Sequence, residues 1–344
     1  MKDNLNDAGA GLYEAIRALP IVSPHGHTAP EWFAEDRPFA DPAELLIIPD
    51  HYVFRMLYSQ GVAMEDLGIG VPAEARDPRA IFRRFAANWR LFLGTPSRGW
   101  LEHTFAHVFG IESPLSPATA DEIYDRIDAA LKTPAFRPRA LLRRFNIDVL
   151  ATTDGALDDL APHAAFKAAG EPTRLIPTFR PDAVLNPAAP GFAEGLSRLA
   201  EITGADTASF SGFLDALRAR RAHFKTHGAT ATDHDAPDLM TCWLPKDEAQ
   251  ALLTKALSGE IDAAGSIRFY NHMLVEMAEM SVDDGLVMQI HAGNRRSTNQ
   301  AVLSRFGRDM GADIPHAADW VHGLNVLLNR VGNDSSLHIL AFTL

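Results

Sequence analysis

The chain has 344 residues, of which 47% are hydrophobic and 22% charged, an ordinary globular composition that is long enough to bury a sizeable core. Its 32 basic and 44 acidic residues give a formal net charge of -12 without a Lys/Arg-rich run, which disfavours nucleic acids and anionic membranes as main partners. Cys242 is the only cysteine, which excludes an intramolecular disulfide and a thiolate zinc cluster and fits a reducing cytoplasm.

The first seven residues show no export signal, because they lack a basic region followed by an apolar core. No apolar run in the chain reaches the ~20 residues that are needed to cross a bilayer. We therefore expect a soluble cytoplasmic protein with one large domain, or with one domain that carries an inserted subdomain.

Short apolar runs alternate along the chain with longer segments of helical periodicity, which is typical of a parallel α/β protein. Seven strands are predicted, at Ile21–Ser23, Leu45–Ile48, Ile147–Thr152, Arg174–Thr178, Ala229–Thr232, Leu286–Ile290 and Leu337–Thr343. Polar or ionisable residues directly follow most of these strands. This repetition predicts chemistry at one end of one sheet, as in (β/α)8 barrels.

The first predicted strand runs into Ser23-Pro24-His25-Gly26-His27. Because successive side chains of a strand alternate between faces, His25 and His27 point the same way and can share one ion. Neutral imidazoles together with a carboxylate form a common site for zinc or a similar divalent ion. The alternative is two polar residues in a loop, but the position at the end of a strand favours a metal site.

About 95 residues separate the second and third predicted strands, far more than one crossover helix needs. This stretch contains segments of helical periodicity at 81–93 and 118–131. We therefore predict an inserted helical subdomain over residues 61–137, beside the mouth of the barrel.

Two later segments are predicted to be core helices. Ser209 can cap a helix whose apolar residues recur at i, i+3, i+4 and i+7, the stripe that packs against a sheet. Residues 262–280 carry a longer apolar set that includes Ile267, which we interpret as packing and not as a cofactor site.

Arg180 follows the fourth predicted strand, in Phe179-Arg180-Pro181-Asp182. A guanidinium cannot bridge two cations, but it can bind a carboxylate or phosphate through two parallel hydrogen bonds. Arg180 therefore indicates at most one metal ion and an acidic substrate. The alternative is a salt bridge to Asp182 or to another carboxylate of the loop.

His291 ends the strand predicted at 286–290 and can be a metal ligand, a proton shuttle or a substrate contact, with a structural histidine as the alternative. Asp233-His234 follows the strand predicted at 229–232. This pair is a weaker indication, because Asp and His also occur together in polar loops.

Several segments taken together resemble the uronate isomerase (glucuronate isomerase) family of the amidohydrolase superfamily. They are Leu19 to His27, Pro49-Asp50-His51-Tyr52 with Arg55-Met56-Leu57, Arg144 to Ile147 leading to Leu150 to Thr153, Phe179 to Val184, Thr232-Asp233-His234, and Gln289 to Gly293. They follow the family's order across essentially the whole chain. The combination is specific, although no single segment is.

The resemblance implies a (β/α)8 barrel and an enzyme that interconverts D-glucuronate with D-fructuronate, and D-galacturonate with D-tagaturonate, in hexuronate catabolism. It implies one divalent ion, with zinc expected, that is held by His25 and His27, and no organic cofactor. The implied partner is a small hexuronate, and the oligomeric state stays open between monomer and homo-oligomer.

The resemblance also implies roles for further residues. His51 and Tyr52 are implied as the catalytic pair at the reacting end of the sugar, while Arg180, His291 and His234 are implied as substrate contacts. Aldose to ketose conversion moves a proton between C2 and C1 through an enediol, so it needs a base, an acid and stabilisation of an oxyanion. The group that removes the C2 proton is not assigned.

The family's barrel ends in an eighth strand with an aspartate that completes the metal site, whereas this sequence stops after Ala341-Phe342-Thr343-Leu344. We therefore expect the barrel to lack its last strand here, with the aspartate ligand beyond Leu344. Two alternatives follow. One is a mononuclear metal-dependent hydrolase of the same superfamily, and the other is a sugar-acid binding relative without turnover.

Overall fold

The computed structural model describes residues 7–342, and the chain divides into two compact units. Unit 1 comprises Met1–Glu35, Leu142–Asn294 and His316–Leu344, whereas unit 2 comprises Asp36–Leu141 and Arg295–Pro315. The predicted insertion at 61–137 falls within unit 2, which begins earlier and adds a second segment of chain. The segment used to predict the absence of an export signal lies almost wholly outside the described residues.

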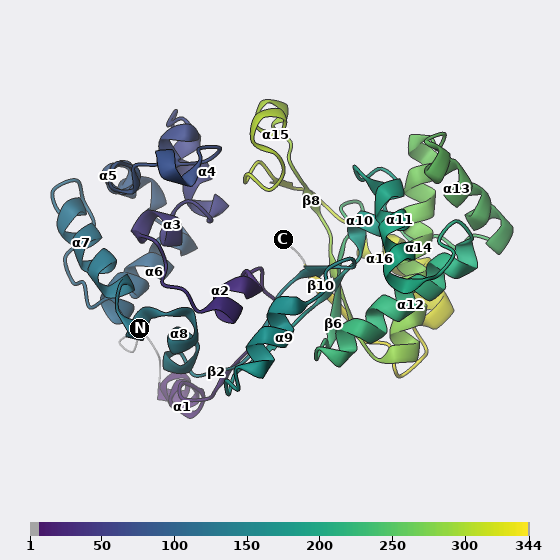
Figure 1. Cartoon of the computed structure of the whole chain (residues 1–344), viewed down its shortest axis with the longest axis horizontal. Coiled ribbons are helices and arrows are strands. Elements are labelled where there is room, and N and C mark those ends of the chain that lie inside the picture. Colours follow the sequence, from purple (N-terminus) through teal and green to yellow (C-terminus); the bar gives the residue numbers. More distant parts are fainter. Residues whose placement is uncertain (1–6, 343–344) are drawn as a thin grey trace. The chain divides into compact units, whose positions relative to one another are not determined.

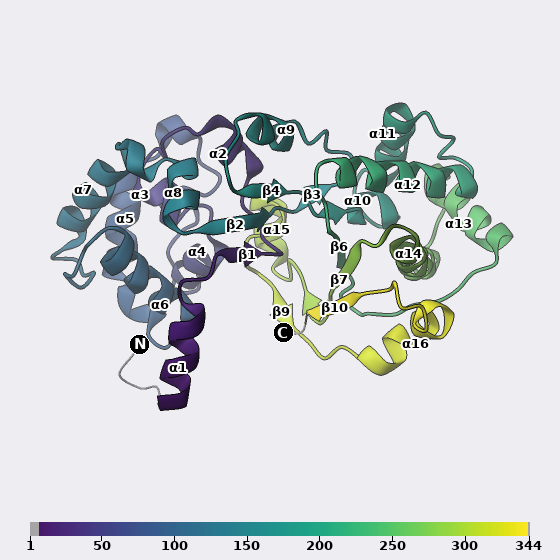
Figure 2. The same cartoon turned by 90° about the horizontal axis from the view of Figure 1, so that it is seen from below.

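Unit 1 is built on parallel strands. In chain order they are β1 (Ile21–Ser23), β2 (Ile147–Ala151), β3 (Asp154–Gly155), β4 (Arg174–Ile176), β5 (Phe179–Arg180), β6 (Ala231–Asp235), β7 (Val287–His291) and β10 (Ile339–Phe342). One sheet has the order β1-β2-β4, which Figure 2 shows side by side, and the other has the order β10-β7-β6-β5-β3. All of these pairings are parallel.

Backbone hydrogen bonds join the two sheets. Thr152 N–H donates to the carbonyl of Ile176, and Thr178 N–H donates to the carbonyl of Thr152. β2 therefore continues into β3 beside β4 and β5, and the strands follow one another in chain order across unit 1. All the predicted strands except Leu45–Ile48 are confirmed to within a few residues, with Thr343 outside the described residues.

Helices supply the rest of unit 1. They are α1 (Asp7–Ile16), α2 (Pro30–Glu35), α9 (Ala161–Ala168), α10 (Asp182–Leu185), α11 (Phe192–Thr203), α12 (Phe210–Thr226), α13 (Lys246–Ser258), α14 (Ala263–Asp284) and α16 (Trp320–Val331), with α8 (Pro138–Arg144) at the unit boundary. In Figure 1, α11, α12, α13 and α14 form one helical group. Phe213 of α12, Met273 of α14 and Met288 of β7 are fully buried in one core cluster.

Each of the two predicted core helices begins directly after a residue whose side chain caps it. Ser209 Oγ accepts from Gly212 N–H at the start of α12, and Asp262 Oδ1 accepts from Gly265 N–H at the start of α14. The prediction that Ile267 packs in the core is wrong, because its side chain is 60% exposed. Ala263, Ala264 and Arg268 of the same helix are exposed as well, so Ile267 belongs to the solvent-facing side of α14.

Unit 2 is helical and has its own core. Its α-helices are α3 (Pro42–Leu46), α4 (His51–Tyr58), α5 (Pro78–Ala87), α6 (Pro96–His103), α7 (Ala120–Leu131) and α15 (Gln300–Phe306). Short 3-10 helices lie at Glu65–Leu67, Ala73–Ala75, Trp89–Phe92 and Pro134–Phe136, and a π-helix lies at Thr104–Val108. β8 (Asn294–Arg295) and β9 (Ile314–Pro315) pair where the second segment begins and ends. Phe82, Phe85 and Ile123 are fully buried in this core. The segments predicted to be helical at 81–93 and 118–131 are confirmed in outline.

The prediction of a strand at Leu45–Ile48 is wrong. Asp41 Oδ1 accepts from the N–H groups of Ala43 and Glu44, and Pro42 occupies the first helical turn, so a helix begins before the apolar run. Ile47 N–H donates to the carbonyl of Ala43, a hydrogen bond of the helical kind. Four apolar residues fit either structure, and the Asp-Pro start decides for helix α3.

No helix within residues 7–342 has both the length and the apolar composition that a membrane span requires.

Candidate metal centre

Three potential ligands come together in unit 1, one just after β1, one in the middle of β6 and one at the end of β7. His25, Asp233 and His291 each offer a ligand atom, and these atoms lie within 4.8 Å of one another. The ring centroids of His25 and His291 are 4.8 Å apart. Two imidazoles and one carboxylate are a suitable donor set for zinc or a similar divalent cation.

The proximity of His25 to His291 shows that the sheet is curled. β1 and β7 are not neighbours, because β2 to β6 lie between them in the strand order. A flat sheet would hold the ends of β1 and β7 several strand spacings of ~4.8 Å apart. The ring of Phe342 on β10 also contacts both histidines, at centroid distances of 5.3 Å from His25 and 4.4 Å from His291.

Asp233 is the charged centre of this group. Its Oδ1 lies 2.9 Å from His291 Nε2, and its Oδ2 lies 3.4 Å from Arg180 Nη1. Burial by itself would raise the pKa of Asp233, but the neighbouring His291 and Arg180 outweigh burial and lower that pKa to about 2. Asp233 is therefore a buried anion at neutral pH.

The residues present fit a cation. Neither carboxylate oxygen of Asp233, nor Nε2 of His291, makes a hydrogen bond of ordinary geometry to any residue within the described range. Buried polar atoms without hydrogen bonds are costly, and a divalent ion bound between them would satisfy all three. The orphaned atoms and the donor chemistry point to the same kind of occupant.

His25 has a partner on the other side of its ring. Its Nδ1 lies 2.7 Å from Oε1 of Gln289, which is buried on β7. His27 is exposed, and its ring stands edge-on to that of His25 with centroids 5.0 Å apart. The structure therefore groups His25, but not His27, with Asp233 and His291.

Arg180 is held beside the centre by carboxylates. Its Nε donates to Asp182 Oδ2 at 2.9 Å, which is the salt bridge weighed above as an alternative. Asp182 also accepts from the hydroxyl of Tyr270 at 3.1 Å and from the backbone N–H of Asp235. Asp182 therefore fixes the Nε side of the guanidinium.

His234 is not part of this group. Successive residues of β6 face opposite ways, so His234 shares a face with Thr232 and not with Asp233. Its Nε2 lies 2.9 Å from Thr232 Oγ1, and burial lowers its pKa to about 3, so the ring is neutral at ordinary pH.

His51 and Tyr52 open helix α4 in unit 2, where Asp50 caps the helix by accepting from Tyr52 N–H. Their ring centroids are 4.4 Å apart, and the Arg55 guanidinium lies 4.8 Å from the Tyr52 ring centroid. Tyr52 is 49% exposed. His51 and Tyr52 are therefore neighbours of each other within unit 2.

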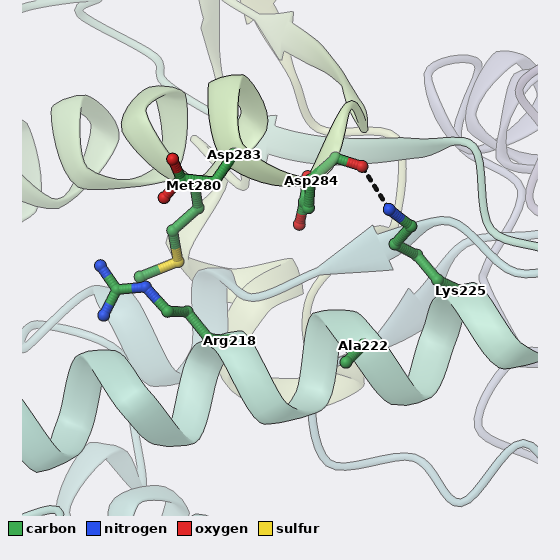
Figure 3. A pocket seen from close by; sticks show the side chains of 6 residues that line it. All are labelled: Arg218, Ala222, Lys225, Met280, Asp283 and Asp284. Carbon is green, nitrogen blue, oxygen red and sulfur yellow. Dashed lines mark hydrogen bonds between the residues drawn. The ribbon is translucent and has the colours of Figure 1, made fainter.

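A separate hollow lies between α12 and α14 (Figure 3). It is lined by Arg218, Ala222, Lys225, Met280, Asp283 and Asp284. Lys225 Nζ donates to the backbone carbonyl of Asp284 there. None of the predicted site residues lines this hollow.

The sequence pattern indicates Asp233 only weakly and does not predict a role for Gln289 or Phe342 at the site. The alternation of side chains along β6 does carry a signal for Asp233. Asp233 and His234 are neighbours in the strand, so only one of them can point to the same side of the sheet as His25 and His291. The role of Gln289 had no such signal, because its partner His25 is 264 positions away in the sequence.

Comparison with known proteins decides the family. A family model described as glucuronate isomerase matches residues 3–342. The chain belongs to the glucuronate isomerase family. Among curated relatives of this family, the uronate isomerase of Rhizorhabdus wittichii is 54% identical over 333 residues, which cover 97% of this chain and 71% of that protein. The uronate isomerase of Rhizobium meliloti is 51% identical, with 97% and 72% covered.

Solved structures of family members have the same fold. The glucuronate isomerase of Caulobacter crescentus matches with a TM-score of 0.94 and 47% identity, over 97% of this chain and 70% of that one. The uronate isomerase of Thermotoga maritima matches with a TM-score of 0.91 and 29% identity, over 98% and 74%. The prediction of an isomerase of this family is therefore confirmed, as is a mixed α/β fold with parallel sheets.

Proposed function

We propose that this chain interconverts D-glucuronate with D-fructuronate, and D-galacturonate with D-tagaturonate, in hexuronate catabolism. The reaction moves a proton between C2 and C1 through an enediol and needs a base, an acid and stabilisation of an oxyanion. The observation that carries the proposal is the His25–Asp233–His291 group beside Arg180, in which buried polar atoms of Asp233 and His291 lack a hydrogen bond of ordinary geometry, in a chain of this family.

We propose that one divalent ion is held by His25, Asp233 and His291 together with His27. Zinc suits this set of donors. When bound, the ion supplies positive charge that stabilises the negative charge developing on the sugar oxygens. His291 has two proposed roles, as a ligand and as a substrate contact, and the metal content of a His291 variant separates them.

Arg180 is proposed to bind the carboxylate of the hexuronate. Asp182 accepts the hydrogen bond of Arg180 Nε, and the contact of Nη1 with Asp233 is long, at 3.4 Å. The two Nη atoms can therefore donate to a substrate carboxylate. This arrangement makes an acidic sugar a better ligand than a neutral one. A substrate contact of His234 stays a prediction, and its hydrogen bond to Thr232 favours support of β6.

His51 and Tyr52 are proposed as the catalytic pair, on the strength of the Pro49-Asp50-His51-Tyr52 segment. An imidazole and a phenol can both donate and accept protons, which suits a transfer between neighbouring carbon atoms. We propose that His51 and Tyr52 share this task at the reacting end of the sugar.

The finer architecture is also a proposal. Strands that follow one another in chain order, all parallel, and a sheet curled enough to bring β1 to β7 support a (β/α)8 barrel with an inserted helical subdomain. Cytoplasmic location, a small-molecule hexuronate partner and the absence of an organic cofactor belong to the same proposal.

An assay on both hexuronates tests the function. The purified protein is incubated with glucuronate or galacturonate, with and without a chelator, and keto-sugar is measured. Keto-sugar formation is expected. Release of acid from a lactone or ester analogue without keto-sugar would instead support the hydrolase alternative, and binding without turnover would support a sugar-acid binding relative.

A further inference from the structure

We infer that Gln289 is a positioning residue that fixes the tautomer of His25 and so determines which ring nitrogen can bind the cation. The inference rests on the proposed metal site. It goes beyond that site because it concerns a residue that acts on the ligand and not on the ion.

The amide of Gln289 can have only one orientation here. Its Nε2 lies 3.3 Å from the carbonyl oxygen of Pro24, which can only accept a hydrogen bond. The NH2 group must therefore face Pro24, because the opposite orientation would place two oxygens together. Oε1 is left facing His25 Nδ1 at 2.7 Å.

The orientation of the amide determines the proton on His25. Because Oε1 can only accept, Nδ1 of His25 must carry the hydrogen in this bond. A neutral imidazole has one N–H, so Nε2 keeps its lone pair. Metal ligation requires that lone pair, and Gln289 therefore prepares Nε2 of His25 as the ligand atom.

Burial makes this hydrogen bond hard to replace. Gln289 is 2% exposed on β7, where it pairs in register with Asp233 of β6. Water cannot readily take the place of its amide at such a position. Removal of the acceptor would leave the ring of His25 free to rotate and to exchange tautomers.

Partners of this kind typically contribute 10–100-fold to metal affinity. The variant Gln289→Leu keeps the approximate size of the side chain and removes the acceptor. Met288→Leu is the matched control, because Met288 is buried beside Gln289 and belongs to the hydrophobic core.

The first measurement is the tautomer of His25 in metal-free protein, read from 15N chemical shifts of labelled histidine and assigned by the signal missing in His25→Gln. The wild type is expected to show hydrogen on Nδ1, and Gln289→Leu is expected to show a mixture of tautomers. If the ring of His25 in the wild type carries its hydrogen on Nε2, the inference is overturned. This result does not depend on any Gln289 variant, so it can be obtained even if Gln289→Leu fails to fold.

The second measurement is the zinc dissociation constant, by competition with a chromophoric chelator. Gln289→Leu should bind zinc about 10–100-fold more weakly, while Met288→Leu stays near the wild type. Equal affinity in the wild type and Gln289→Leu would refute the positioning role. Failure of the wild type to bind zinc would instead count against the proposed metal site, and the tautomer measurement would still test the hydrogen bond.

Discussion

Asp233 determines the chemistry of the candidate centre at the scale of single residues. It is fully buried and yet ionised, and its carboxylate oxygens lie 2.9 Å from His291 Nε2 and 3.4 Å from Arg180 Nη1. A buried carboxylate without hydrogen bonds of ordinary geometry requires compensation by charge. A divalent cation at this point would supply that compensation and would bring His25 and His291 into one coordination sphere.

Metal content tests this assignment. Replacement of His25 with Ala or of Asp233 with Asn should lower bound zinc to a substoichiometric level, because a site with few protein ligands tolerates the loss of one poorly. The measurement is elemental analysis of protein purified with zinc. His322→Ala is the control, since His322 is an exposed histidine of the same unit. Unchanged zinc in both variants would show that these residues are not ligands.

Arg180 gives a test of substrate charge. Arg180→Lys keeps the positive charge but loses the planar two-point geometry, so kcat/KM for glucuronate should fall at least about tenfold. The comparison is with Arg198→Lys, a change in an exposed pair with Glu201. Glucose should be a poor substrate of the wild type. Comparable turnover of glucose and glucuronate would argue against recognition of the carboxylate.

Tyr52 gives a test of proton transfer. Tyr52→Phe keeps the ring and removes the hydroxyl, so we expect kcat to fall by about 10²-fold or more with unchanged folding. Tyr58→Phe makes the same change at the end of the same helix and should leave kcat unaltered. A wild-type rate in Tyr52→Phe would leave Tyr52 with a packing role beside Arg55.

Some residues of the candidate site could be predicted from the sequence alone, and others could not. His25 could be predicted as a candidate ligand from the His-x-His sequence after a strand, but the same pattern predicted His27, which the structure does not group with Asp233 and His291. Asp233 and Gln289 needed the fold, since their partners lie on strands that are distant in sequence and meet only when the sheet curls. His234 looked equivalent to Asp233 in the sequence, and the alternation of β6 separates them.

At the scale of elements, local caps decided the structure where apolar pattern was ambiguous. Leu45–Ile48 was predicted as a strand, but Asp41 and Pro42 begin helix α3 ahead of it. The helices at 210–226 and 263–284 were predictable because Ser209 and Asp262 mark their starts and the apolar stripes are long. Short strands such as β3 and β5 carry no such signal.

Helix α14 carries a buried carboxyl that makes stability depend on pH. Burial, followed by the nearby Glu279, raises the pKa of Glu276 to about 7 from 4.5. The fold therefore favours the neutral acid, and this contribution to stability is complete below pH 4.5 and is lost as the pH rises through 7. Arg218 and Arg330 oppose the shift only in part.

Glu276→Gln tests this sign, because the amide stays neutral at every pH. Between pH 5 and pH 8 the free energy of unfolding of the variant should rise by about 2 kcal/mol relative to the wild type. The measurement is urea unfolding at both values. Glu260→Gln, on the surface, should show no such change. A variant that loses stability relative to the wild type as the pH rises would show that the sign is wrong.

At the scale of the whole chain, the sequence predicted a parallel α/β protein because strands and helices alternate and polar residues recur at strand ends. The order of the strands follows the chain, as expected. The extent of the helical unit could not be read from the sequence, since residues 295–315 join it from a distant part of the chain. Such assembly depends on tertiary packing, which local periodicity does not encode.

Proton transfer on glucuronate tests the central claim most directly. In heavy water, an isomerase that works through an enediol removes the C2 proton of glucuronate and delivers that proton or a solvent deuteron to C1 as fructuronate forms, and both the loss of the C2 proton and the formation of keto-sugar can be followed by ¹H NMR. We predict loss of the C2 signal together with the appearance of keto-sugar signals, in the presence of zinc. A C2 signal that persists in the protein's presence, without keto-sugar, would contradict the claim that this chain is a uronate isomerase.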